Sequence, residues 1–299
     1  MSEFDRVYKL TAIRAPETGE IEGLGRSFFE ELETITEITQ LQIKFKVEKH
    51  LRSRPNSAEI TIVNLAASSR DDFLRVPQRI RLEAGYDDTP RLLFIGDLRH
   101  ASNEHVGTEW LTKLQLADGG RAYAKARVNR SYAKGTPFSS VITEIAKAFG
   151  VPAPSLPPEL QSRLSAGEVI TGAASKALTR LLAPYGFEWS FQDERLQVLR
   201  VDGVQPGTIR VLSEEDGLIG TPVIAPPKIQ AETGAHRAGE APRVPKATVK
   251  HLLYPEITPG EQLGVQSRSV SGGFRADVVT HEGDLFGEDW TTTVEATAI

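Results

Sequence analysis

A nine-residue pattern that occurs twice is the feature that most restricts how this chain can fold. Residues 107–115 and residues 287–295 both read Gly-x-acid-Trp-x-Thr-x-aliphatic-polar, and a strand-like segment with a phenylalanine and a histidine precedes each copy. A self-match that covers both strands of a hairpin predicts that a supersecondary unit has been duplicated. Two unrelated hairpins with similar turns are the alternative interpretation of the same letters.

Four residues of this repeat are the candidate structural anchors. Gly107 and Gly287 are expected to allow a tight turn or a bulge at the entrance to the strand. Trp110 and Trp290 are expected to anchor each hairpin by burying a large aromatic surface. The repeat therefore predicts architecture and no chemistry.

Alternation of apolar and polar residues with a period of two continues outside the repeat. It is visible at residues 41–48 and 58–63, and turn residues separate it from further strand-like segments at 92–98 and 247–253. Such alternation predicts strands with one buried face. Several short strands with turns between them favour a barrel or a sandwich, so we predict a mainly β (α+β) fold.

The middle of the chain follows a helical pattern. Thr136 is a good N-cap and Pro137 suits the first helical position, and the apolar residues at 141–149 then fall on one helical face. A second helix is expected at about 174–185, and a hairpin is expected at 187–201.

These patterns divide the chain into three predicted parts. Residues 1–124 are expected to form a first β-barrel module, residues 125–202 a small α/β insert, and residues 203–299 a second β-barrel module. Residues 222–246 are rich in Pro, Ala, Gly and charge, and they are expected to form a flexible loop.

Composition excludes several classes of protein. The formal net charge is -5 and the pI is about 5.8, which argues against a dedicated nucleic-acid binder because such proteins carry a basic excess. The absence of cysteine excludes a disulfide framework and thiolate chemistry. No secretory signal and no apolar run of about 20 residues is present, so a cytoplasmically made protein without a membrane segment is expected.

The sequence gives little sign of chemistry. No phosphate-binding glycine loop, nucleophile elbow or paired-histidine zinc motif is present, so we expect no enzyme, no catalytic residue and no cofactor. His281, Glu282 and Asp284 form the densest metal-ligand-like cluster, although a polar hairpin loop gives the same letters. Trp189 with Phe187 and Phe191 could stack on sugars, but alternating residues of a packed hairpin are the simpler interpretation.

The pattern of turns and strands resembles the hub proteins at the centre of the baseplate in tailed phages and related contractile injection systems. The stretches that carry the resemblance are residues 55–65, 94–98, 216–222, 249–260, 273–276 and 281–292. It spans most of the chain and includes no catalytic signature.

The resemblance implies a homotrimer. Members of that family carry two tube-like β-barrels per chain, so three chains form a pseudo-sixfold ring that joins a hexameric tail tube to a trimeric central spike. It implies a location in the virion, at the tail baseplate. The implied partners are the tail tube or a tube-initiator protein, the spike, the tape-measure protein and the baseplate wedge, with genomic DNA passing through the lumen without sequence-specific binding.

Two other functions remain open from the sequence. The insert with Trp189 could be a cell-wall (peptidoglycan) binding module, and an unrecognised hydrolase site could assemble from distant residues. No nucleophile, base and orienting group occur at a recognisable spacing, which weighs against the hydrolase.

Overall fold

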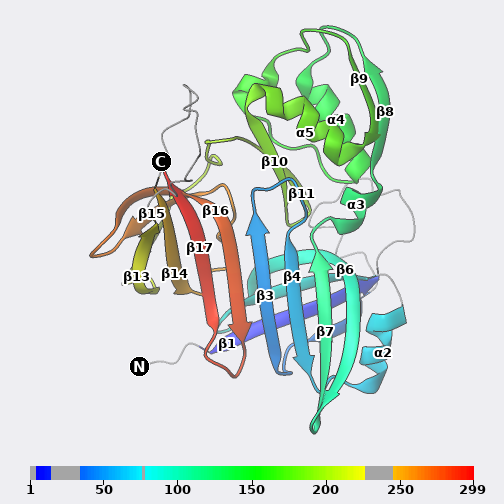
Figure 1. The fold of residues 1–299 in the computed structure, drawn as a ribbon. Coiled ribbons are helices and arrows are strands. Elements are labelled where there is room, and N and C mark those ends of the chain that lie inside the picture. Colours follow the sequence, from blue (N-terminus) through cyan, green and yellow to red (C-terminus); the bar gives the residue numbers. More distant parts are fainter. Residues whose placement is uncertain (1–4, 15–33, 76–77, 226–244) are drawn as a thin grey trace, which may run out of the picture.

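Strands dominate the architecture of the chain (Figure 1). The computed structural model describes residues 5–14, 34–75, 78–225 and 245–299. Most strands belong to one large, mainly antiparallel sheet, which confirms the mainly β fold predicted from the alternation. Among the described helices, none has the length and the apolar character that a membrane crossing requires.

The described part of the N-terminal module contains seven strands and one helix. On its third strand, Ile43, Phe45 and Val47 are buried while Lys44 and Lys46 are exposed, so the period of two gives a strand with one buried face, as predicted. The elements are β1 (Arg6–Arg14), β2 (Thr34–Ile38), β3 (Ile43–His50), β4 (Ser57–Val63), α2 (Ala67–Arg75), β5 (Gln78–Tyr86), β6 (Arg91–Val106) and β7 (Glu109–Ala117).

The insert is the part of the chain from α3 to β11, and it lies beyond one end of the large sheet (Figure 1). Its main helix begins one residue later than predicted, because Pro137 is the N-cap and the Thr136 hydroxyl donates to the Ala133 carbonyl at 2.8 Å. Gly150 ends this helix with φ 72°, as its position suggested. The elements are α3 (Gly120–Lys125), β8 (Arg127–Tyr132), α4 (Phe138–Phe149), β9 (Glu168–Ala173), α5 (Ala174–Leu182), β10 (Phe187–Gln192) and β11 (Arg195–Arg200), with short 3-10 turns at Pro158–Gln161 and Ala183–Tyr185.

The C-terminal module contains six strands among its described residues. Residues 222–225 lie in one of them and not in the loop predicted at 222–246, and residues 226–244 of that loop lie outside the described residues. The elements are β12 (Arg210–Ser213), β13 (Leu218–Ala225), β14 (Lys246–Leu252), β15 (Gln262–Gln266), β16 (Ser271–Asp284) and β17 (Trp290–Ala298).

The two modules share one strand order. The N-terminal module runs β3-β4-β7-β6-β5 across the sheet, and the C-terminal module runs β13-β14-β17-β16-β15. Even an irregularity in the ladder recurs, between Leu98 and His100 in β6 and between Ala276 and Val278 in β16. The match between the two Trp-containing segments therefore reflects two hairpins in the same topological position.

The predicted barrels are not closed within one chain. Across the described residues the strand path is open, from β13 at one end to β2 at the other. The N-terminal module curls over itself, so that β1 crosses behind β3 and β4 (Figure 1). Alternation indicates which face of a strand is buried but not which strand lies beside it, and β3 pairs with β16 instead of closing its own module.

Three hydrophobic cores stabilise the part of the chain that the structure describes. One lies inside the insert, and one lies in each module. The core of the N-terminal module also contains Leu253 and Trp290 from the C-terminal module. The two modules are thus joined by shared packing as well as by the β3–β16 ladder.

Candidate assembly surfaces

Two of the strand stretches that have an open edge are candidate interfaces. β13 pairs with β14 along one side, and the half of β6 from His100 to Val106 pairs with β7 along one side. Within the described residues, no strand covers the second side of either stretch. Apolar side chains are exposed on both, including Val223 at 64% and Val106 at 49%. Open edges of this kind present unpaired backbone N–H and C=O groups to a partner strand.

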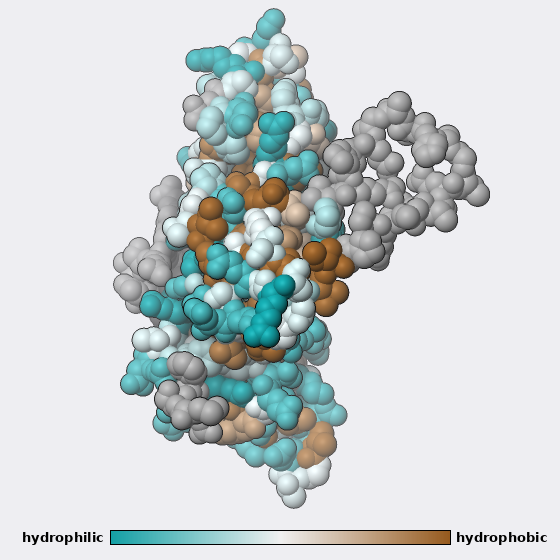
Figure 2. Space-filling model, turned by 90° about the vertical axis from the view of Figure 1, so that its left-hand side faces the viewer, coloured by the Kyte–Doolittle hydropathy of each residue, from teal (hydrophilic) through white to brown (hydrophobic). Residues whose placement is uncertain are grey.

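The surface around β13 is correspondingly apolar. Ile219 and Ile224 are also exposed, so much of the side-chain surface of this strand is hydrocarbon. Figure 2 looks onto the side of the molecule on which β13 lies, and it shows apolar side chains (brown) exposed there among polar ones (teal). Exposed apolar patches bordered by polar residues commonly mark interaction sites.

The corresponding edge of β16 is already covered. Residues 278–284 of β16 pair with residues 44–50 of β3 in an antiparallel ladder. Two ion pairs cross this joint, from Lys46 Nζ to Glu282 at 2.7 Å and from Lys44 Nζ to Asp284 at 2.8 Å. The β3–β16 joint fuses the two modules into one continuous sheet.

One face of this sheet is polar from β14 to β6. Residues opposed across neighbouring strands share it, as where Lys46 stands between Glu282 and Glu59. A further ion pair joins Lys113 to Glu104 at 2.6 Å. Lysines and carboxylates are interspersed on this face, and the carboxylates are slightly more numerous, so the face carries no excess of positive charge. Its charged side chains include Lys44, Lys46, Glu48, Glu59, Glu104, Lys113, Lys250, Glu282, Asp284 and Glu295.

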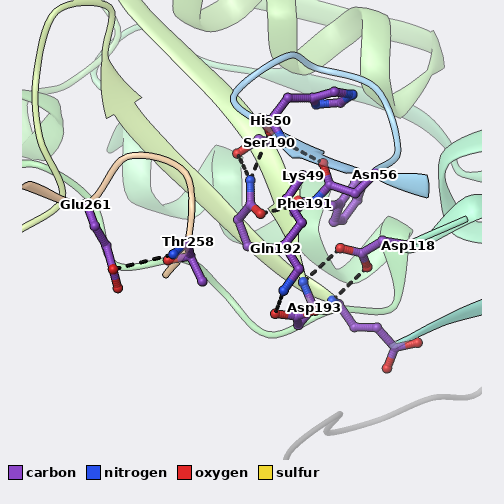
Figure 3. Close-up of polar contacts among 11 residues, drawn as sticks. Lys49, His50, Asn56, Asp118, Ser190, Phe191, Gln192, Asp193, Thr258 and Glu261 are labelled. Atoms are coloured by element: carbon purple, nitrogen blue, oxygen red, sulfur yellow. Dashed lines mark hydrogen bonds and ion pairs between the residues drawn. The ribbon is translucent and has the colours of Figure 1, made fainter. Parts of the chain in front are cut away.

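A buried polar junction attaches the insert to the N-terminal module (Figure 3). The turn between β10 and β11 consists of Asp193 and Glu194, both with positive φ. The Asp118 carboxylate, just after β7, accepts the Asp193 N–H at 2.7 Å and the Glu194 N–H at 2.8 Å. Lys49 Nζ donates to the Asp193 carboxylate at 2.7 Å. Burial raises the pKa of Asp118 well above its ordinary value, and the neighbouring Asp193 adds to that shift.

An amide pair holds the strand that leads into this turn. Asn56 Nδ2 donates to the Phe191 carbonyl at 2.7 Å and to the Gln192 amide oxygen at 3.0 Å. Gln192 Nε2 in turn donates to the His50 carbonyl at 3.0 Å (Figure 3). These buried bonds satisfy backbone groups on both sides, so the turn is fixed in position.

Glu194 completes the junction on its other side. Its carboxylate lies 3.3 Å from Arg79 Nε, which also lies 3.4 Å from the Asp97 carboxylate. Asp97 accepts the Arg121 N–H at 2.8 Å. Burial raises the pKa of Glu194 to about 7, although Arg79 opposes the shift.

This shift predicts a pH-dependent attachment of the insert. The folded-state pKa of Glu194 lies above its unfolded value, so the folded state binds the extra proton and its stability falls as pH rises from about 4.5 to about 7. Glu194→Gln is expected to remove this pH dependence. Its total contribution to the free energy of unfolding over that range is about 3 kcal/mol at most. The measurement is the free energy of unfolding in urea, for both proteins, between about pH 5 and about pH 8. Parallel curves for the two proteins would contradict the prediction.

The two tryptophans of the repeat differ in burial, and its two glycines differ in the reason that favours glycine. Trp290 is 1% exposed and Trp110 is 39% exposed, so the expected burial holds for Trp290 and is wrong for Trp110. Trp110 instead lies at the open end of its hairpin, against the His105 ring and under the Arg70 guanidinium. Gly107 has φ 62° in a two-residue turn, as expected. At Gly287 a Cβ would lie 2.5 Å from the Asp284 carboxylate, so close approach favours glycine there.

The ligand-like cluster near His281 does not converge. The buried His281 ring bonds through Nδ1 to the Thr292 hydroxyl at 2.9 Å, on the core side of β16. Glu282 and Asp284 face the other side, where they pair with lysines. In the described ranges, no three His, Asp or Glu side chains form a metal-binding group.

Trp189 is not available for sugar stacking. It is buried in the core of the insert, and its Nε1 donates to the Thr179 hydroxyl at 2.9 Å. Phe187 and Phe191 are buried beside it. The sugar-stacking interpretation of these residues is therefore wrong, and packing explains their alternation.

Sequence reasoning missed the residues of the polar junction. The sequence patterns give Asp118 no role, and residues 193–194 fall inside the hairpin expected at 187–201. Lys49 did carry a signal, because it occupies the buried phase of the alternation of β3, after Ile43, Phe45 and Val47. A lysine in an apolar phase indicates a buried partner of opposite charge.

Solved structures of tail proteins have a fold similar to that of this chain. No protein-family model matches the sequence, and no curated protein matches it either. A tail protein from Neisseria meningitidis superposes with a TM-score of 0.65 at 10% identity, covering 97% of this chain and 96% of that one. The 43 kDa tail protein of prophage MuSo2 from Shewanella oneidensis gives 0.61 at 9% identity, covering 98% and 96%.

A third solved structure with a similar fold comes from a secretion system. An Escherichia coli component of the type VI secretion system, similar in structure to the T4 bacteriophage tail proteins gp27 and gp5, gives a TM-score of 0.58 at 13% identity. The aligned region covers 86% of this chain and 73% of that chain. At such identities the likeness establishes the fold, and this chain has the fold of phage-type tail proteins.

Proposed function

We propose that this chain is a structural hub subunit of a phage-type tail, and that three copies form a ring around a channel. The observation that carries the proposal is the duplicated strand order, which gives each chain two modules of one topology. Three chains then present six similar modules. Such a ring can join a sixfold tail tube at one end to a threefold spike at the other.

The likeness to tail proteins supports this role. The alignment with the Escherichia coli secretion component, which is similar in structure to gp27 and gp5, covers 86% of this chain. The role is one of binding and geometry, with no catalytic step. The protein is a part of the virion, at the tail baseplate.

The two ends of the ring differ in symmetry. The β6–β7 and β16–β17 hairpins both point to the end of the sheet opposite the insert (Figure 1). Each module contributes one such tip, so the tip end is pseudo-sixfold and binds the tail tube or tube initiator. The insert occurs once per chain, so its end is threefold and holds the spike.

The polar face of the sheet lines the channel. Three of its lysines are paired with carboxylates at 2.6–2.8 Å, in the pairs Lys46–Glu282, Lys44–Asp284 and Lys113–Glu104. Tight DNA binding requires a surplus of cations that replaces the counterions of the phosphates. A wall of nearly balanced charge gives no such surplus, so DNA passes along it without being held.

The proposal predicts a trimeric mass for the purified protein. Mass photometry of the wild type, alone and with the spike protein of the same tail, is expected to give three copies of a 32.8 kDa chain in one particle. Electron micrographs of the particle are expected to show a ring with an open centre. A chain that stays monomeric both alone and with the spike contradicts the proposed ring.

A further inference from the structure

A groove of about 1260 Å³ runs beside the β10–β11 hairpin, at the base of the insert next to the large sheet (Figure 1). One wall is β11, and the proline-rich segment from Pro152 to Glu159 is another. Ile95 of the N-terminal module and Thr258 of the C-terminal module also line it. The groove therefore lies where the insert meets both modules.

Every residue of β11, from Arg195 to Arg200, lines this groove. Successive side chains of a strand point to opposite faces, so a groove on one face would contact only every second residue. Contact with all of them means that the groove follows the edge of the strand. Among the described strands β11 pairs only with β10, so this edge is open.

The ladder between β10 and β11 shows which backbone groups point into the groove. The Phe191 carbonyl accepts a hydrogen bond from Asn56, so it points away from β11. Leu196 is opposite Phe191, and in an antiparallel ladder the backbone groups of such a pair both point outward. The same holds two residues further along, at Val198. Within the described ranges, the N–H and C=O groups of Leu196 and Val198 have no backbone partner.

The far end of the hairpin gives the same phase. There the Val201 N–H donates to the Gly186 carbonyl at 3.0 Å, so this pair is hydrogen-bonded. Hydrogen-bonded pairs recur at every second position of an antiparallel ladder, which includes Leu199 and Gln197. Val198 lies between them, so two separate contacts direct its backbone groups into the groove.

This arrangement of backbone groups is suited to an extended peptide. Two N–H donors and two C=O acceptors, two residues apart along one edge, match the main chain of another strand. Addition of a strand to an open edge is a common mode of peptide recognition. The groove supplies the space for such a strand, and its walls limit the side chains that the strand can carry.

The charges of the groove favour an acidic strand. Asp193 and Glu194, in the turn before β11, already pair with cations of the N-terminal module. The exposed charged residues of the described lining are Arg195, Arg200 and Glu159. The two arginines stand at the ends of β11, about 17 Å apart at the rise of a strand, and the four residues between them are uncharged. A matching segment has an acidic residue near each end, about five positions apart.

We infer that a terminal segment of the spike protein, extended and acidic at these two positions, pairs with the open edge of β11. The inference rests on the proposed function, which places the spike at the insert end of the ring, and it specifies the contact that holds the spike there. Each chain has one such groove, so a ring of three chains offers three equivalent grooves to the three chains of a threefold spike.

Hydrogen exchange resolved to single amides tests the pairing. In this chain alone, the Gln197 and Leu199 amides are expected to exchange slowly because they bond to β10, and the Leu196 and Val198 amides are expected to exchange fast. Addition of the purified spike protein of the same tail is expected to slow exchange at Leu196 and Val198 at least tenfold. Gln197 and Leu199 serve as internal controls.

A charge reversal tests the acidic character of the segment. Arg195→Glu with Arg200→Glu is expected to weaken binding of the spike protein at least tenfold in a titration with fluorescently labelled spike. The matched control is Lys147→Glu with Lys176→Glu, which makes the same change of charge at exposed positions on α4 and α5. The control is expected to bind the spike within twofold of the wild type, and both variants are expected to keep the unfolding midpoint of the wild type.

The outcomes separate this contact from the proposed hub. A spike that binds the ring without slowing the Leu196 and Val198 amides overturns the contact and leaves the hub standing. If these amides are already slow in the monomer, or become slow when the ring forms without the spike, this chain itself fills the groove and the spike is overturned as its occupant. Slowing by the spike that is unchanged in the charge-reversed variant overturns the acidic segment, and a chain that neither trimerises nor binds the spike overturns both the contact and the hub.

Discussion

Trp290→Ala is expected to lower the free energy of unfolding by about 3–5 kcal/mol. The indole is 1% exposed, and it packs edge-on against Phe45 with ring centroids 5.2 Å apart. Its Nε1 donates to the Gly85 carbonyl at 3.1 Å, so truncation also leaves a buried acceptor without its partner. Because Trp290 comes from one module and Phe45 from the other, the loss also weakens the attachment between modules.

The repeat offers a matched control in Trp110→Ala. This indole is 39% exposed, and its main partner is the Arg70 guanidinium 4.0 Å above the ring. An exposed cation–π contact contributes about 0.5–1 kcal/mol, so a loss of that size is expected. Urea unfolding of both variants measures the difference. Equal losses at the two positions would show that both tryptophans are buried anchors, as the sequence alone suggested.

Lys49→Met is the second change with a large expected effect, a loss of about 3–5 kcal/mol. The Lys49 side chain is 1% exposed, and its ammonium group holds the Asp193 carboxylate at 2.7 Å. Methionine keeps the length of the side chain but leaves the partly buried Asp193 carboxylate without its cation. We expect faster hydrogen exchange at the Asp193 and Glu194 amides, because the insert is released from the N-terminal module.

Lys46→Met is the control for that change. Lys46 lies on the same strand and makes an ion pair of the same length, 2.7 Å, but its side chain is 58% exposed. Exposed ion pairs contribute at most about 1 kcal/mol. If Lys46→Met costs as much as Lys49→Met, burial is not the source of the effect.

Local patterns predicted the strands and helices well. Alternation located β3 and β4, and the helical stripe located α4, because each strand or helix must bury its own apolar residues. The repeat also located the duplicated hairpins. β1 was missed although Tyr8, Leu10 and Ala12 alternate with polar residues there, so its signal was present.

Relations between distant segments were beyond the same patterns. The open sheet replaces two closed barrels because β3 pairs with β16, and no local property of either strand specifies the other. The polar junction could not be predicted from the sequence for the same reason, because Lys49, Asp118 and Asp193 come from three segments far apart in the sequence. Trp110 is exposed because its hairpin lies at an edge of the sheet. The repeat has the same letters around Trp290, so the sequence could not show that the two tryptophans differ in burial.

The β3–β16 joint also sets the order of events during synthesis. Lys44 pairs with Asp284, so the joint cannot form until Asp284 has left the ribosome, long after Lys44. Until then β3 presents an open edge, and contacts so distant in sequence form slowly. An open strand on a partly made chain can capture β16 of another copy, which gives swapped dimers in place of rings. Expression at high concentration therefore favours strand-swapped oligomers. Slow synthesis, or a chaperone bound to the open strand, favours the correct sheet.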